Sequence, residues 1–151
     1  MQRIDLPAES LLPHRPPMLL IDRALEANDD TITASAVVHA DTIFVENGRL
    51  PAHALLEYMA QTMGLWACWQ AKQAGLPPPV GFLLGTRSLK LAVDSVAVGS
   101  DLALRTTRIY ISDEGLAQFD CEARLNGEQI ACAKINAFQP KDATSLMDLT
   151  P

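Results

Sequence analysis

One long apolar segment, residues 50–74, dictates the architecture that the rest of this chain has to accommodate. It reads LPAHALLEYMAQTMGLWACWQAKQA and is followed by Gly75 and by prolines at positions 77–79. Pro51 suits the first position of a helix, while the glycine and the prolines are typical of a helix end. A helix of about 24 residues measures about 36 Å and spans a small domain. Because the segment is apolar on nearly all sides, we expect a buried central helix over residues 51–74.

The helix carries one acidic residue, Glu57, and His53 lies one turn before it on the same face. A buried carboxyl group is costly when it is charged and unpaired, and burial favours its protonated form. An imidazole with an ordinary pKa of about 6.5 is largely neutral at pH 7 and can accept a proton. The pair therefore predicts an acid–base site at the start of the helix. The alternative is a structural carboxylate held by backbone N–H groups or an arginine, beside a histidine that caps the helix.

The helix face that carries Glu57 continues with small side chains, at Ala60, Gly64, Cys68 and Ala71. Residues three and four apart share one face of a helix. We therefore expect another part of the chain to pass close to this face.

The composition of the chain excludes several classes of function. Its 151 residues fit one domain over residues 1–151, and its net charge of −6 argues against general nucleic-acid binding. The opening MQRIDLPAES has no apolar signal segment, and Glu57, Gln61 and Gln70 interrupt the apolar helix. We therefore expect a cytoplasmic protein without a membrane span.

Cysteines and histidines show no metal-binding pattern. Cys68, Cys121 and Cys132 are odd in number and are not spaced as metal ligands, which favours buried, reduced thiols. The three histidines, His14, His39 and His53, form no ligand motif such as HExxH. We predict no metal and no cofactor.

Alternating apolar and polar residues predict strands on both sides of the helix. The clearest case is residues 117–125, followed by the hairpin signal Asn126-Gly127, and Gly85 indicates a bulge within a longer strand. We expect strands at residues 18–21, 31–40, 80–91, 102–112, 117–125 and 129–138. Because short turns join the last four, they are antiparallel neighbours. The fold class is therefore α+β, with an antiparallel sheet wrapped around one long central helix, and a dimer joined at the sheet edges would close the open flanks.

Three segments resemble the 3-hydroxyacyl-(acyl-carrier-protein) dehydratases, a family with the hotdog fold. LLPHRPPMLLIDRAL at 11–25 is similar to the family's opening segment, and LLEYMAQTMG at 55–64 to its helix motif, in which a catalytic acid is followed by x-x-A-Q. Residues 81–102 resemble the third strand and the turn after it, with matches at Arg87, Lys90, Val98, Gly99 and Asp101. Within the family, the chain looks most like the divergent dehydratases of aryl-polyene gene clusters.

The resemblance implies dehydration of a 3-hydroxyacyl thioester on acyl carrier protein to the trans-2-enoyl thioester, with Glu57 as the acid. The family's catalytic histidine stands in an H-F-P loop fourteen residues before that acid. Here that position holds Ile43, and the loop DTIFVENGRL contains no histidine. We therefore infer from chemistry alone that His53 replaces the missing base, with His39 as the second candidate.

The resemblance also implies an acyl tunnel and a docking surface for the acidic carrier protein. Phe82, Leu83 and Leu84 are candidates for the tunnel wall, and N–H groups near Gly85 or at a helix start could polarise the thioester carbonyl. Ordinary core packing explains the three apolar residues equally well. Arg87 and Lys90, together with Arg49, are candidates for docking, and the alternative for each is a solvated charge.

Two other functions share these sequence features. A hotdog thioesterase uses a carboxylate on the same fold to release a free acid. A non-catalytic subunit of a heterodimeric dehydratase would explain the missing loop histidine. The sequence leaves homodimer and heterodimer equally open.

Overall fold

The computed structural model of this chain describes residues 1–79 and 82–139, with residues 82–84 described by their backbone alone. Its strands and helices, in chain order, are β1 (Gln2–Pro7), the 3₁₀ turn η1 (Ala8–Ser10), β2 (Arg23–Ala27), β3 (Thr31–Val37), β4 (Arg49–Pro51), the 3₁₀ turn η2 (Ala52–Ala54), α1 (Leu55–Gln73), β5 (Phe82–Leu91), β6 (Ser95–Ala97), β7 (Asp101–Ile111), β8 (Leu116–Leu125) and β9 (Glu128–Phe138).

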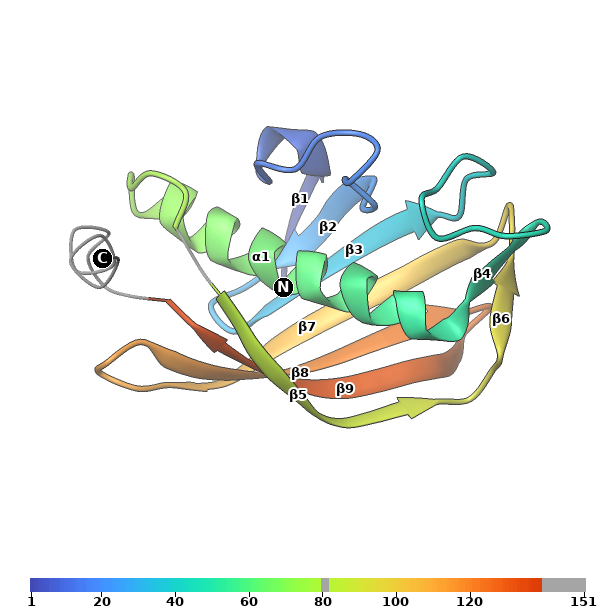
Figure 1. Cartoon of the computed structure of the whole chain (residues 1–151). Coiled ribbons are helices and arrows are strands. Elements are labelled where there is room, and N and C mark those ends of the chain that lie inside the picture. The colour runs from blue at the N-terminus through green and yellow to red at the C-terminus, as the bar shows by residue number, and fades with distance from the viewer. Residues whose placement is uncertain (80–81, 140–151) are drawn as a thin grey trace, which may run out of the picture.

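A seven-stranded sheet curls around α1, which lies across its inner face (Figure 1). The strand order is β1-β2-β3-β7-β8-β9-β5, and every neighbouring pair is antiparallel. The short strands β4 and β6 form a separate antiparallel pair beside the start of the helix. The predicted architecture of an antiparallel sheet around one long helix is confirmed.

The helix begins later than the sequence predicts. Pro51 still belongs to β4, where it pairs with Ser95, and the N–H of Ala52 donates to the carbonyl of Asp94 over 3.0 Å. This strand pairing holds the backbone until residue 52, and the 3₁₀ turn η2 then leads into α1 at Leu55. His53 therefore lies in the entry turn and Glu57 in the first turn of the α-helix.

The core forms between α1 and the inner face of the sheet. The Trp66 ring on the helix meets the Phe119 ring of β8 edge to face, with centroids 5.4 Å apart and planes at 63°. Along β8, the predicted alternation is confirmed, because one set of side chains is buried under the helix: Ala117, Phe119, Cys121 and Ala123. The bulge predicted at Gly85 is also present, as a register shift between Leu83 and Gly85 in the β5–β9 pairing.

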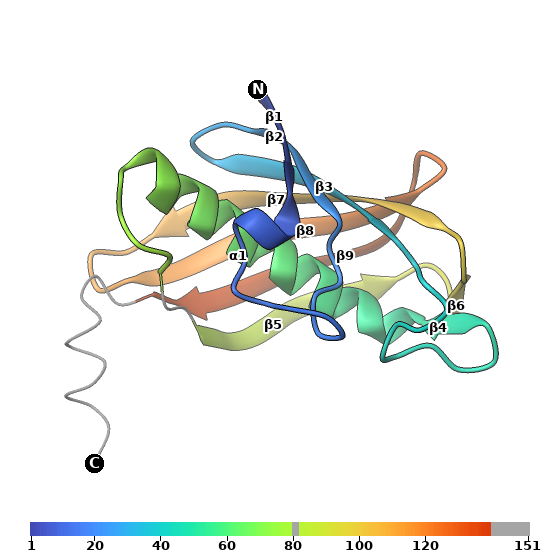
Figure 2. The ribbon, with the colours of Figure 1, turned by 90° about the horizontal axis from the view of Figure 1, so that it is seen from above.

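The segment between η1 and β2 passes over α1 on the side away from the sheet (Figure 2). Leu12 of this segment is buried and packs against the helix at Gly64, where an added Cβ would lie 3.4 Å from Leu12 Cδ2. The close approach predicted for the small-residue face is confirmed at this point. The strand predicted at residues 18–21 is wrong, because the backbone there pairs with a helix side chain, as described below.

Candidate active site

A cavity of about 290 Å³ lies between the N-terminal segment, α1 and the inner face of the sheet. Leu12, Pro13 and His14 line it from the N-terminal segment, and Ala117, Phe119 and Ala137 line it from the sheet. The helix contributes two polar residues, Glu57 and Gln61, and a run of small or apolar ones: Ala60, Met63, Gly64, Ala67 and Cys68. The cavity is therefore polar at one end of the helix face and apolar along the rest.

Glu57 is held at the polar end by a hydrogen bond within the helix. Gln61 Nε2 donates to Glu57 Oε1 over 3.1 Å, as the four-residue spacing allows. The same amide nitrogen donates to the carbonyl of Met18 over 2.7 Å, while the N–H of Leu20 donates to Gln61 Oε1 over 2.9 Å. These bonds occupy backbone groups that a strand at residues 18–21 would need. Gln61 thus ties the N-terminal segment to the helix and orients the carboxyl group of Glu57.

His14 enters the cavity from the N-terminal segment. The Arg15 guanidinium fixes the local backbone, with Nη1 donating to the carbonyls of Leu12 over 2.9 Å and of His14 over 2.7 Å. The imidazole is half-buried, and its Nδ1 is buried without a hydrogen-bond partner. Glu57 and His14 therefore both line this cavity.

The two histidines selected from the sequence lie elsewhere. His53 is exposed on the entry turn η2 and does not line the cavity that contains Glu57. His39 is exposed two residues after the end of β3, and its Nε2 lies 3.6 Å from Asp22 Oδ1. The structure thus brings together Glu57 and His14, and neither His53 nor His39 shares their cavity.

The predicted tunnel residues and the docking candidates Arg87 and Lys90 fall on β5, and Arg49 falls on β4. The side chains of Phe82, Leu83 and Leu84 lie outside the described part of the chain, and Gly85 has open space where a Cβ would stand. Arg87 and Lys90 are exposed, and neither lines the Glu57 cavity. Arg49 is engaged locally, since its Nε donates to Ser95 Oγ over 2.6 Å.

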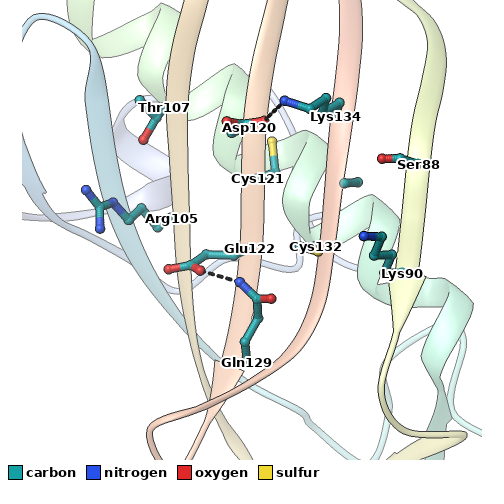
Figure 3. Close-up of a pocket in the computed structure, with 11 residues that line it drawn as sticks. Ser88, Lys90, Arg105, Thr107, Asp120, Cys121, Glu122, Gln129, Cys132 and Lys134 are labelled. Atoms are coloured by element: carbon teal, nitrogen blue, oxygen red, sulfur yellow. Dashed lines mark hydrogen bonds and ion pairs between the residues drawn. The ribbon is translucent and has the colours of Figure 1, made fainter.

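A second depression, the outer groove, crosses β7, β8, β9 and β5 on the sheet face away from the helix (Figure 3). It measures about 370 Å³, and Lys90 and Arg105 lie at its two sides. Its carboxylates have partners, because Lys134 Nζ lies 3.0 Å from Asp120 Oδ1 and Gln129 Nε2 donates to Glu122 Oε2 over 2.7 Å. Burial raises the pKa of the Cys121 thiol to about 12, so this cysteine supplies no thiolate at neutral pH.

Two further structural observations concern the described residues. No group of three or more His, Cys, Asp and Glu side chains gathers there as a metal ion would require. No helix among them combines the length and the apolar character needed to cross a membrane.

The sequence predicts a role for Glu57 and none for His14, which lines the same cavity. The histidine stands between Pro13 and the pair Pro16-Pro17, and prolines so close together are typical of a stiff loop. This stiff loop is the one sequence signal that marks the position of His14. Its proximity to the helix depends on the path of the N-terminal segment, which no local pattern specifies. From the small residues after Glu57, the sequence predicts only a close approach of another segment. In the structure they both accommodate Leu12 and line the cavity.

Comparison with known proteins identifies the family. The model of the ApeP-like family, described as ApeP dehydratase, matches residues 6–148. The 3-hydroxyacyl-[acyl-carrier-protein] dehydratase FabZ of Brucella melitensis biotype 2 is 30% identical over 136 residues, covering 85% of this chain and 83% of that protein. The solved dehydratase heterocomplex ApeI:P from Xenorhabdus doucetiae matches with a TM-score of 0.85 and 26% identity, covering 97% of this chain and 99% of that chain.

A more distant likeness concerns the fold alone. A hypothetical thioesterase from Streptococcus pneumoniae, solved with coenzyme A, matches with a TM-score of 0.61 and 13% identity over 77% of this chain and 83% of that chain. The hotdog fold and the dehydratase resemblance expected from the sequence are both confirmed. The chain is a hotdog-fold enzyme and belongs to the ApeP-like dehydratase family.

Proposed function

We propose that this dehydratase converts a 3-hydroxyacyl thioester, carried on acyl carrier protein, to the trans-2-enoyl thioester in fatty-acid or aryl-polyene biosynthesis. The observation that carries the proposal is the cavity in which Gln61 orients Glu57 at the end of an otherwise apolar helix face. A β-hydroxyl beside Glu57 leaves the acyl tail to lie along Ala60, Gly64 and Cys68. Such a site suits a polar reacting group on an apolar chain.

Dehydration requires a base for the C2 proton, an acid for the leaving hydroxyl and a stabiliser for the thioester oxygen. Glu57 is the proposed acid, in keeping with its place in the helix motif. Backbone N–H groups at the start of the helix or near Gly85 are the proposed stabilisers. His53, one turn before Glu57, stays a prediction for the base, with His39 as its alternative.

Carrier recognition and the apolar wall extend this proposal to β5. Arg87 and Lys90 are exposed cations that an acidic carrier protein can contact despite the net charge of −6. Phe82, Leu83 and Leu84 remain proposed wall residues. Reversing both charges should raise KM for carrier-bound substrate and leave KM for the pantetheine thioester unchanged.

The oligomeric state is part of the proposal. β5 ends the sheet, so an edge-to-edge dimer through this strand would extend the sheet into a second chain. The heterocomplex from Xenorhabdus doucetiae and the absence of a histidine in residues 41–50 support pairing with a second dehydratase chain.

The test is product identification by mass after the purified chain meets a 3-hydroxyacyl carrier protein, alone and with a dehydratase chain that has an intact loop histidine. The proposal expects the enoyl thioester in at least one arm. Free acid would identify a thioesterase, and unchanged substrate in both arms would reject the proposal.

A further inference from the structure

We propose that Ala117 and Ala137 determine how wide an acyl tail this dehydratase accepts. This inference rests on the proposed function and concerns the same cavity, the one that contains Glu57. The two alanines are direct cross-strand partners on β8 and β9, both are buried, and both line the cavity from the sheet side. Because each side chain is a single methyl group, the pair keeps this part of the sheet wall low.

The inner face of the sheet changes abruptly in side-chain size at this pair. The neighbouring row across β8 and β9 joins Phe119 to Ile135, and the Phe119 ring meets Trp66 of the helix edge to face, with centroids 5.4 Å apart. The next inward-facing row joins Ala117 to Ala137. The large row thus brings the sheet into contact with the helix, whereas the small row borders the cavity.

The helix wall opposite the sheet is also built from small side chains. Ala60, Gly64 and Ala67 line the cavity, and their spacing places them on one face of α1. Protein interiors are close-packed, so small side chains on both the helix wall and the sheet wall are not what core packing alone favours. They suit a cavity in which the tail of a ligand takes the place of larger side chains, and the cavity measures about 290 Å³.

The alanine pair lies far from the acid along the cavity. Glu57 is in the first turn of α1, whereas Trp66, which contacts the neighbouring row, lies nine residues later, or about 13.5 Å along the helix axis. The β7–β8 turn that precedes Ala117 lies at the same end of the molecule as the C-terminus of α1 (Figures 1 and 2). A substrate whose hydroxyl meets Glu57 therefore reaches the alanines only with the distal part of a long tail.

Valine at either position tests the idea in a way that an ordinary core alanine does not share. Beside a cavity the added methyl groups narrow the space and gain contacts, whereas in a close-packed core they force strain. Ala123 provides the matched control, because it lies on β8, is fully buried, and is not among the described residues that line the Glu57 cavity. Any gain from the higher β-propensity of valine is common to all three positions.

The experiment compares Ala117→Val, Ala137→Val and Ala123→Val in the full chain, in whichever assembly dehydrates a 3-hydroxyacyl thioester. The substrates are three 3-hydroxyacyl pantetheines: one with a short straight tail, one with a long straight tail, and one of the same length that ends in a phenyl ring as a wide probe. For each variant, kcat and KM are measured with every substrate, and the thermal midpoint is measured without substrate.

We expect both cavity variants to lose on the order of tenfold or more in kcat/KM for the wide tail, since an apolar pocket discriminates by this much for a small change in volume. The loss should be smaller for the straight tail of the same length and absent for the short tail, which does not reach the alanines. Their thermal midpoints should equal or exceed that of the wild type. Ala123→Val should have a lower midpoint and the wild-type preference among tails.

Several results would overturn the inference. An unchanged ratio of kcat/KM between wide and straight tails in the folded cavity variants does so, as does an equal change of that ratio in Ala123→Val. Equal losses for all three substrates, or loss of folding in both cavity variants, assign the alanines a structural role and also overturn it. A wild type that is inactive with every substrate overturns the proposed function, and this inference with it. An active wild type with unchanged preference in the variants overturns this inference alone.

Discussion

The two depressions of this molecule lie on opposite faces of one sheet and differ in how their polar groups are satisfied. In the outer groove, Asp120 meets Lys134, and Glu122 meets Gln129 and Arg124. In the inner cavity, Glu57 has the amide of Gln61, and the Nδ1 atom of His14 has no partner. The outer groove is the larger by volume, at about 370 Å³ against about 290 Å³. The proposed site is assigned to the inner cavity on the pairing of its polar groups and not on volume.

The comparison favours the inner cavity as the proposed site because of the pairing of its polar groups and its apolar lining, and not because of its volume. Exposed ion pairs are solvated and contribute little energy, so the outer groove is an ordinary sheet surface. The inner cavity combines a carboxyl group and an imidazole with an apolar wall, where electrostatic interactions are stronger than in water. We therefore expect substitutions in the inner cavity to change activity or stability strongly and those on the outer face to change them little.

The largest effect is expected from Glu57→Gln, which tests whether the inner face carries the acid. The amide is nearly isosteric and can still accept the hydrogen bond from Gln61, but it has no carboxyl proton to donate. Dehydration should fall on the order of 10²- to 10⁴-fold with an unchanged thermal midpoint. The matched control is Glu122→Gln in the outer groove, which should keep the wild-type rate. Equal rates for both folded variants would refute the assignment.

The next effect concerns stability and compares two amides. Gln61→Leu leaves the Leu20 N–H and the Met18 carbonyl without their partner, at a cost of about 2–4 kcal/mol in the free energy of unfolding. Gln118 on the outer face donates only to Asn136 Oδ1 among the described residues, and Gln118→Leu should cost less than about 1 kcal/mol. Urea titration of both variants measures the difference, and equal losses would contradict the role of Gln61 as a tie between loop and helix.

A smaller effect tests whether the acyl tail follows the helix. In Gly64→Leu the new side chain points toward Leu12 and fills the middle of the cavity. Long-chain substrates should lose kcat/KM on the order of tenfold or more per excluded methylene, since that is the discrimination an apolar pocket provides. Short-chain substrates serve as the internal control and should react at nearly the wild-type rate. An unchanged preference for chain length would place the tail elsewhere.

The smallest effect is expected on the outer face. Lys134→Ala removes an exposed ion pair with Asp120, and such pairs contribute about 0–1 kcal/mol. The variant should therefore dehydrate substrate at the wild-type rate and unfold within about 4 °C of the wild type, on the order expected for a loss of this size. A strong loss of turnover would give the outer groove a function that its paired charges do not explain.

Much of the fold was predictable because the patterns that specify the helix and the long strands lie within short stretches of sequence. The helix has a long apolar run with a proline and a glycine at its ends, and β8 alternates cleanly. The strands β4 and β6 have three residues each, which is too short for a periodic signal, and β1 has mostly exposed polar residues. The apolar run at 18–21 imitates a strand, and only Gln61, about 40 positions later, decides its pairing.

The candidate site was accessible to sequence reasoning only where its residues share one helix. Glu57 follows from the helix motif, because an acid on a buried helix demands an explanation from the sequence alone. The position of His14 in the same cavity depends on the path of the N-terminal segment over the helix, which is a long-range property. His53 stays a prediction that rests on its four-residue spacing from Glu57, because such spacing is the geometry that a sequence reveals most easily.

The most direct test of the account is to identify which face holds the substrate. A 3-hydroxyacyl pantetheine with a photoreactive group at the end of its acyl tail is irradiated with the protein, and the labelled residues are located by mass. The account predicts labels along the inner cavity, at Gly64, Ala67, Cys68 or Leu12. Labels confined to Lys90, Glu122 or Lys134 in the outer groove would contradict it.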